Sequence, residues 1–180
     1  MPRWTGCARA EAVAILPTPL LRPAGPGDAA ALNAILWATY ESTWRPQLSA
    51  DRDAQLRASG STARYVQSRL AHFQVAECDG TLAGFVDWEG DFIDALHVLP
   101  RWQGRGVGRA LLAHAEAAMR TAGRAQARLE TDTFNTQALG FYSGQGYAQL
   151  ATYPDEEWDS GLTTVLMAKA LLPGGSLQLP

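Results

Sequence analysis

The spacing of hydrophobic residues divides the chain into short strands and amphipathic helices. The period changes most clearly at Gly106, after which apolar residues recur every three or four positions and predict a helix that ends at Gly123. Before this helix, strand-like runs at 73–78 and 82–88 are joined by an Asp-Gly dipeptide at 79–80, which suits a tight hairpin turn. The pattern therefore predicts an antiparallel hairpin that precedes a long helix.

The remaining elements follow from the same signals. A strand at 20–22 leads through a turn rich in proline and glycine to Asp28, a good N-cap for a helix over 29–40. The stretch 42–60 is expected to be irregular or weakly helical. Further helices are expected at 61–72 and 135–143, and further strands at 92–99, 125–131, 147–153 and 162–171. Strands flanked by helices indicate a mixed α/β fold of the α+β type.

This pattern predicts a single domain over residues 19–172, preceded by an irregular leader at 1–18 and followed by a tail at 173–180. With 47% hydrophobic and 18% charged residues, the composition is that of a globular protein. The formal net charge of -3 gives no general basic surface, so nucleic acid is not expected as a partner. No apolar run approaches the roughly 18 to 20 residues of a membrane helix, so no membrane partner is expected either.

The two cysteines, Cys7 and Cys78, lie in different contexts and form no disulfide framework. Two isolated thiols are typical of a reducing compartment, so we expect the protein to be cytoplasmic.

The segment with the clearest chemical content is 96–108, which runs from a strand through a glycine-rich turn into the long helix. Its three glycines at 104, 106 and 108 allow a ligand to approach the backbone closely. The N–H groups at the start of a helix carry partial positive charge, which suits a pyrophosphate. Arginines at 101, 105 and 109 add positive charge nearby. The pattern indicates an anion site, although the same glycines and arginines would also suit a plain tight turn with solvated charges.

Two other phosphate-binding motifs fit this segment poorly. The glycines lack the G-x-G-x-x-G spacing of a dinucleotide fold, and they follow a hairpin rather than the first strand of a parallel sheet. No Gly-Lys-Ser/Thr sequence follows, so a P-loop is also excluded.

The segment resembles motif A of the GCN5-related N-acetyltransferases, whose Gln/Arg-x-x-Gly-x-Gly/Ala signature matches Gln103, Gly106 and Gly108. The order of predicted elements from about Leu20 to Leu171 also matches that family. The resemblance implies a mixed, mostly antiparallel sheet of about six to seven strands with about four helices. It also implies a splay between the fourth and fifth strands.

A second segment, 135–147, is similar to the family's Asn-x-x-Ala-x-x-Phe-Tyr-x-x-x-Gly-Phe/Tyr motif. Asn135, Ala138 and Tyr142 fall at i, i+3 and i+7, which places them on one stripe of a helix. Gly140 and Gly144 are expected to weaken this helix, each by about 1 kcal/mol relative to alanine.

The resemblance implies that acetyl-CoA is the cosubstrate and that no metal takes part. The backbone N–H of Val98 would bind the oxyanion of the thioester carbonyl. Tyr142 would act as general acid toward the leaving thiolate, although a tyrosine at the edge of the core that bonds to backbone is the alternative. The cofactor-binding residues implied are Leu96, Val98, Gln103, Gly104, Arg105, Gly106, Val107, Gly108, Arg109, Asn135, Ala138 and Tyr142.

The reaction also needs a base, because an alkyl ammonium of pKa near 10 cannot attack while it is protonated. The leading candidates are His97, Glu89 and Asp94. Asp91, Glu130, Asp132 and a chain of water molecules are further alternatives. Each carboxylate could instead be a solvated surface charge, and His97 an ordinary strand histidine.

The segments expected to choose the acceptor are 37–60 and 153–161. The second combines acidic and aromatic residues, which suits a cationic amine but equally suits an exposed acidic hairpin. We therefore predict an acetyl-CoA-dependent N-acetyltransferase that acts on a primary amine of a small molecule or peptide by direct attack in a ternary complex. The alternative is a non-catalytic acyl-CoA-binding sensor or interaction module of the same fold. A homodimer is compatible with this fold, although the sequence specifies no partner surface.

Overall fold

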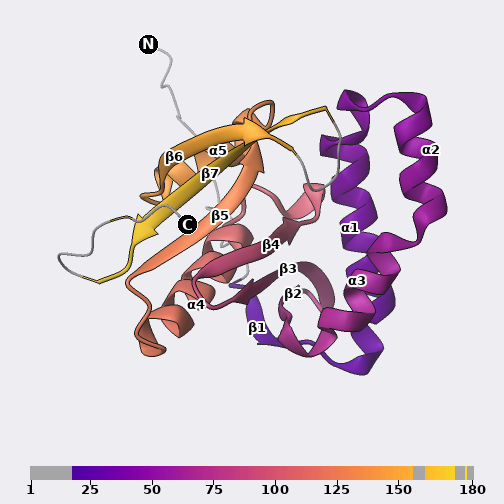
Figure 1. Ribbon diagram of the computed structural model, residues 1–180. Helices are drawn as coiled ribbons and strands as arrows, with labels where there is room; N and C mark the ends of the chain where they lie inside the picture. Colours follow the sequence, from indigo (N-terminus) through magenta and orange to yellow (C-terminus); the bar gives the residue numbers. More distant parts are fainter. Residues whose placement is uncertain (1–17, 156–160, 173–176, 178–180) are drawn as a thin grey trace, which may run out of the picture.

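A single mixed sheet organises the protein (Figure 1). The computed structural model describes residues 18–155, 161–172 and 177, and its seven strands lie in the order β1-β2-β3-β4-β5-β7-β6. All neighbours in this sheet are antiparallel except β4 and β5, which are parallel. The strands are β1 (Leu20–Pro23), β2 (Gln74–Cys78), β3 (Thr81–Glu89), β4 (Phe92–Val98), β5 (Gln126–Asp132), β6 (Ala148–Pro154) and β7 (Thr163–Ala170).

Five α-helices and four short 3-10 turns accompany the sheet in the described part of the chain. The helices are α1 (Ala29–Thr43), α2 (Ala50–Ser59), α3 (Ser61–Arg69), α4 (Val107–Thr121) and α5 (Thr136–Gly144). The 3-10 turns are Pro26–Asp28, Arg45–Gln47, Leu70–His72 and Pro100–Trp102. The expected fold class is confirmed, with one helix more than expected.

Two hydrophobic clusters lie on opposite faces of the sheet. Val75 and Phe85 join residues of α1 and α3 in one cluster. Their strand neighbours Ala76 and Val86 join residues of α4 in the other. Successive side chains of a strand point to opposite faces, so α1 and α3 cover one face and α4 covers the other. Phe141 of α5 packs against the α4 cluster, so α5 shares that face.

The parallel pair β4 and β5 separates soon after it begins. The two strands pair only at Phe92 with Arg128 and at Ile93 with Leu129. Beyond these residues β4 and β5 are not paired with each other. The splay expected between the fourth and fifth strands is therefore present, and it opens the sheet at its centre.

Most local turn predictions are confirmed. Asp79 and Gly80 have φ angles of 50° and 72°, the positive values that a tight hairpin requires. Gly123 follows α4 with a φ angle of 74°. Asp28 differs from its prediction, because its side chain does not cap α1 but accepts hydrogen bonds from Gly25 N at 2.7 Å and from Arg22.

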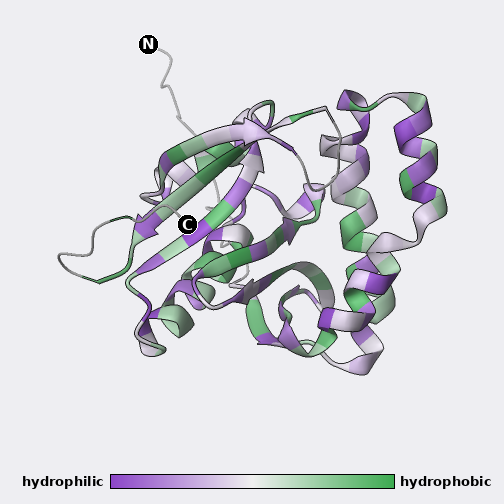
Figure 2. Cartoon of the chain, in the orientation of Figure 1, coloured by the Kyte–Doolittle hydropathy of each residue, from purple (hydrophilic) through white to green (hydrophobic). Residues whose placement is uncertain are grey.

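The stretch 42–60, expected to be irregular or weakly helical, is helical over its second half, which forms α2. Ser49 caps this helix by accepting a hydrogen bond from Arg52 N, and Gly60 ends it with a φ angle of 62°. Figure 2 shows α2 as a mostly hydrophilic helix, and none of its residues is buried. The helix therefore forms from good caps without the apolar stripe that would reveal it in a sequence.

None of the helices in the described ranges is long and apolar enough to cross a membrane. The predicted leader at 1–18 and tail at 173–180 lie almost wholly outside the described residues, as does the middle of the acidic segment, 156–160.

Candidate active site

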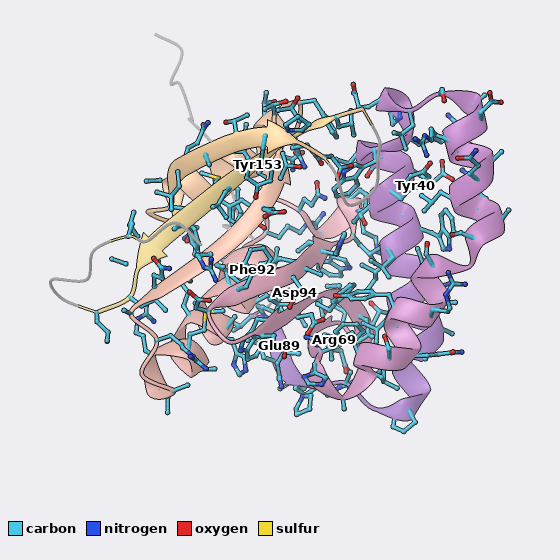
Figure 3. The ribbon with its side chains drawn as sticks, viewed as in Figure 1. Tyr40, Arg69, Glu89, Phe92, Asp94 and Tyr153 are labelled. Carbon is cyan, nitrogen blue, oxygen red and sulfur yellow. The ribbon has the colours of Figure 1, made fainter. Side chains whose placement is uncertain are left out.

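A cavity of about 650 Å³ lies where β4 and β5 separate. Its walls come from α1 and the start of α3 on one side, from β4 and β5 at the base, and from one face of α5 and the end of β6. Figure 3 shows Tyr40 on α1 and Tyr153 on β6, which both line this cavity, with Phe92 and Asp94 on β4 below them in this view. The predicted site residues that line it are Asp94, Leu96, His97, Asn135, Ala138 and Tyr142.

Val98 does not line the cavity, but its backbone faces the gap in the sheet. Leu99 N donates to Ala83 O of β3 at 2.8 Å. Backbone N–H groups alternate between the two sides of a strand, so the N–H groups of Val98 and Leu96 point away from β3. They point toward β5, which has already diverged at this level.

The glycine-rich turn lies beside this gap. Gln103 Nε2 donates to Val98 O at 3.0 Å and holds the turn against β4. Gly106 precedes α4 with a φ angle of 87°, a left-handed conformation that favours glycine. A Cβ atom at Gly108 would lie 3.5 Å from Phe141 and 3.6 Å from Val98, so the first turn of α4 contacts both α5 and β4. The segment from Gln103 to Arg109 thus adjoins the cavity without lining it.

The second motif places Asn135, Ala138 and Tyr142 along one side of the cavity. Asn135 Oδ1 accepts a hydrogen bond from Ala138 N at 3.1 Å, so this side chain caps α5. Tyr142 lies two turns further on and is only 8% exposed. Burial raises the pKa of Tyr142 above its ordinary value, so the phenol stays protonated at neutral pH. A further link joins the two motifs, since Gln137 Nε2 donates to Gln103 Oε1 at 2.9 Å.

His97 is held from both sides. Its Nδ1 lies 2.8 Å from the Thr39 hydroxyl of α1, and its ring stacks on Phe85. Burial lowers the pKa of His97 to about 4, so the ring is neutral at neutral pH.

The other two candidates for the base have different surroundings. Glu89 lies outside the cavity lining, and its side chain is 76% exposed and paired with Arg69 at 2.8 Å. Asp94 lies in the cavity wall, where Arg69 approaches it at 3.5 Å. Burial raises the pKa of Asp94, and the nearby Asp87 carboxylate adds to this effect. Figure 3 shows Arg69, Glu89 and Asp94 grouped at one end of the site.

The charge of the cavity is one-sided. Four carboxylates line its described part, and no lysine or arginine does; the four are Asp94, Glu130, Asp132 and Asp155. Asp132 accepts a hydrogen bond from the Trp44 indole Nε1 at 2.8 Å. Sequence reasoning missed this contact, because the two residues are 88 positions apart and neither lies in a family motif.

Comparison with known proteins identifies the family. Residues 29–147 match the acetyltransferase (GNAT) family. The chain belongs to this family. It is 30% identical to the aminoglycoside N(6')-acetyltransferase type 1 of Stenotrophomonas maltophilia over 144 residues, which cover 75% of this chain and 90% of that protein. It is 38% identical to the blasticidin-S acetyltransferase of Streptomyces morookaense over 96 residues, which cover 53% of this chain and 68% of that protein.

Solved GNAT structures have the same fold. A GCN5-related N-acetyltransferase from Rhodopseudomonas palustris superimposes with a TM-score of 0.73 at 25% identity, covering 87% of this chain and 98% of that chain. The PaiA N-acetyltransferase of Thermoplasma acidophilum, solved in complex with coenzyme A, superimposes with a TM-score of 0.65 at 22% identity, covering 85% and 99%. The protein is therefore an acyltransferase of the GNAT type.

Proposed function

We propose that the enzyme transfers the acetyl group of acetyl-CoA to a primary amine of a small cationic molecule. The observation that carries the proposal is the cavity at the splay, where exposed strand backbone and a buried tyrosine meet a wall of carboxylates. A carboxylate wall without lysine or arginine attracts an ammonium group and repels an anionic acceptor. Two relatives support the choice of a small molecule, since their names assign them an aminoglycoside and blasticidin S.

The residues around the splay suit the acyl donor. The outward-facing backbone groups of Leu96 and Val98 can pair with the amide chain of pantetheine as a further strand would. The first N–H groups of α4, from Val107 to Arg109, have no partner one turn earlier in the helix and suit the pyrophosphate. Asn135 keeps its side-chain NH2 group for the same ligand, because capping uses only its oxygen.

The chemistry then follows from two groups. The Val98 N–H would donate to the oxygen of the thioester carbonyl as negative charge develops there. The Tyr142 hydroxyl would protonate the sulfur as the carbon–sulfur bond breaks, because the thiol that forms has a pKa of about 8.5.

Calorimetric titration with acetyl-CoA, followed by thiol release with a panel of amines, tests this proposal. We expect acetyl-CoA to bind and thiol to be released only when a cationic amine is present. Release with neutral or anionic amines alone would contradict the acceptor class, and the absence of acetyl-CoA binding would contradict the donor.

A further inference from the structure

The splay divides the site into a donor side and an acceptor side. Val98 and Leu96 belong to the hydrophobic cluster on the α4 face, and Tyr142 reaches that cluster from α5. His97 stacks on Phe85 of the opposite cluster and bonds to Thr39 of α1. Side chains that face α1 are therefore separated by the sheet from those that face α4.

Asp132 lies at the end of β5 on the acceptor side. Leu129, three positions earlier on the opposite face of β5, packs in the α4 cluster. The Asp132 carboxylate instead reaches Trp44 at the end of α1. The Trp44 indole, which donates to this carboxylate, also contacts the His97 ring of β4, with 6.0 Å between the ring centroids. Asp132 and the part of β4 that is proposed to hold the acyl donor thus line the same cavity across the gap in the sheet.

The surroundings of Asp132 differ from those of Asp94 and Glu130. Asp94 has Arg69 nearby. Glu130 accepts a hydrogen bond from another neutral donor, the Tyr153 hydroxyl, but Glu130 is exposed to solvent whereas Asp132 is half-buried. Asp132 accepts from the neutral Trp44 indole through Oδ2. Burial raises the pKa of its carboxyl group, and the Asp155 carboxylate, which also lines the cavity, adds to this effect. A carboxylate that is oriented by one neutral donor keeps its negative charge and its second oxygen for a cation.

We propose that Asp132 binds the acceptor ammonium and takes its proton, and that Trp44 is the residue that positions it. This inference rests on the proposed acetyl transfer to a cationic amine. The ammonium passes one proton to the Asp132 carboxylate, and the free amine then attacks the carbonyl carbon as the carbon–nitrogen bond forms and the carbon–sulfur bond breaks. The thiolate takes the proton of Tyr142, the second proton of the attacking nitrogen replaces it, and Asp132 releases the first proton to solvent.

The substitution Asp132→Asn removes the charge but keeps an oxygen that can accept from Trp44. With spermidine or kanamycin A as acceptor, we expect kcat/KM for the amine to fall about 100-fold or more, the usual loss when a general base is removed. We also expect the acidic limb of the pH–rate profile to disappear while acetyl-CoA affinity stays at the wild-type value. The matched variants Asp94→Asn and His97→Gln should keep the acidic limb of the pH–rate profile, because Asp132 is unchanged in both.

Trp44→Phe provides an independent readout. The indole hydrogen bond holds the pKa of Asp132 down, so its loss should move the acidic limb to higher pH. A role in packing alone would lower activity without moving the limb. An unmoved limb in Trp44→Phe, or a wild-type limb in Asp132→Asn, overturns the inference.

Calorimetric binding of spermidine to the CoA complex separates this inference from the proposed function. Asp132→Asn should weaken that binding at least tenfold, whereas Asp51→Asn on exposed α2 should leave it unchanged. If Asp132→Asn binds spermidine as the wild type does, the inference fails even where acetyl transfer occurs. If no amine is acetylated but the Asp132→Asn binding defect is present, the proposed transfer fails while the ammonium site stands.

Discussion

At the scale of single residues, Tyr142 is the side chain whose role is most directly testable. Its hydroxyl belongs to a buried ring on the cavity wall, and burial keeps it protonated. We expect Tyr142→Phe to lower kcat about 100-fold or more while the affinity for acetyl-CoA changes little, because only the proton donor is removed. Stopped-flow thiol release and calorimetry measure the two quantities.

The neighbouring Tyr147 offers a matched control for that experiment. Its ring contacts the Tyr142 ring at 5.7 Å between centroids, but it does not line the cavity. Tyr147→Phe should therefore keep the wild-type kcat. Equal losses in both variants would show that disturbed packing, and not proton donation, explains the effect of Tyr142→Phe.

His97 makes stability depend on pH. Its pKa is about 4 in the folded chain and has the ordinary value of about 6.5 when unfolded. As the pH falls below 6.5, the unfolded chain binds a proton that the folded chain does not, so the free energy of unfolding decreases. At pH 4 the free energy of unfolding is lower by about 3 kcal/mol than at neutral pH because of His97 alone.

His97→Gln tests this contribution, because glutamine can still bond to Thr39 but does not titrate. We expect the free energy of unfolding, from urea titrations between pH 7 and 4, to decrease less in the variant than in the wild type. Parallel curves for the two proteins would contradict a depressed histidine pKa.

At the scale of elements, two glycines should respond in opposite directions. A Cβ atom at Gly84 of β3 would lie 2.5 Å from the carbonyl oxygen of His97, a backbone atom that cannot rotate away. Gly84→Ala should therefore push β4 aside and lower both the melting temperature and the activity, since Val98 faces Gly84 in the register. Gly140 of α5 has open space around its Cβ position, so Gly140→Ala should stabilise the protein by up to about 1 kcal/mol.

Thermal unfolding and acetyl transfer by both variants check this prediction. A Gly84→Ala variant with wild-type melting and activity would show that β3 and β4 tolerate a wider spacing. A destabilised Gly140→Ala would show that α5 has no room for the added methyl group.

Elements with a strong local signal were predictable, and contacts between distant segments were not. The hairpin at 79–80 and helix α4 follow from turn residues and apolar spacing, and both are present. Helix α2 has no apolar stripe, so periodicity predicted only an irregular or weakly helical stretch there, although Ser49 and Gly60 mark its ends. Contacts between distant segments were not predictable, as Glu116 shows. This buried glutamate of α4 is paired with Lys169, which lies 53 residues away in the chain.

The candidate site shows the same contrast between local features, which the sequence predicts, and contacts between distant segments, which it does not. The stripe of Asn135, Ala138 and Tyr142 could be derived from helical spacing, and all three residues line the cavity. The surroundings of a base candidate could not be derived, because they depend on neighbours from other elements. Arg69 of α3 places a cation near Asp94, and Trp44 at the end of α1 gives Asp132 a neutral donor. No local sequence pattern predicts either contact.

At the scale of the whole molecule, the proposed reaction has two substrates meet at the splay from opposite faces of one sheet. In this proposal the donor side is formed by β4, α4 and α5, and the acceptor side by α1, α3 and the end of β5. Both substrates would then be bound at once, so the amine would attack the thioester without an acetylated enzyme. The described cysteine, Cys78, is buried in β2 and does not line the cavity.

We therefore expect sequential kinetics. Double-reciprocal plots for acetyl-CoA at several fixed amine concentrations should intersect, because both substrates must be present before either product leaves. Enzyme incubated with radiolabelled acetyl-CoA and no amine should carry no covalent label after denaturation. Parallel lines together with labelled protein would mean that a side chain accepts the acetyl group first. The splay would then serve the donor alone, and the acceptor would have to enter after CoA has left.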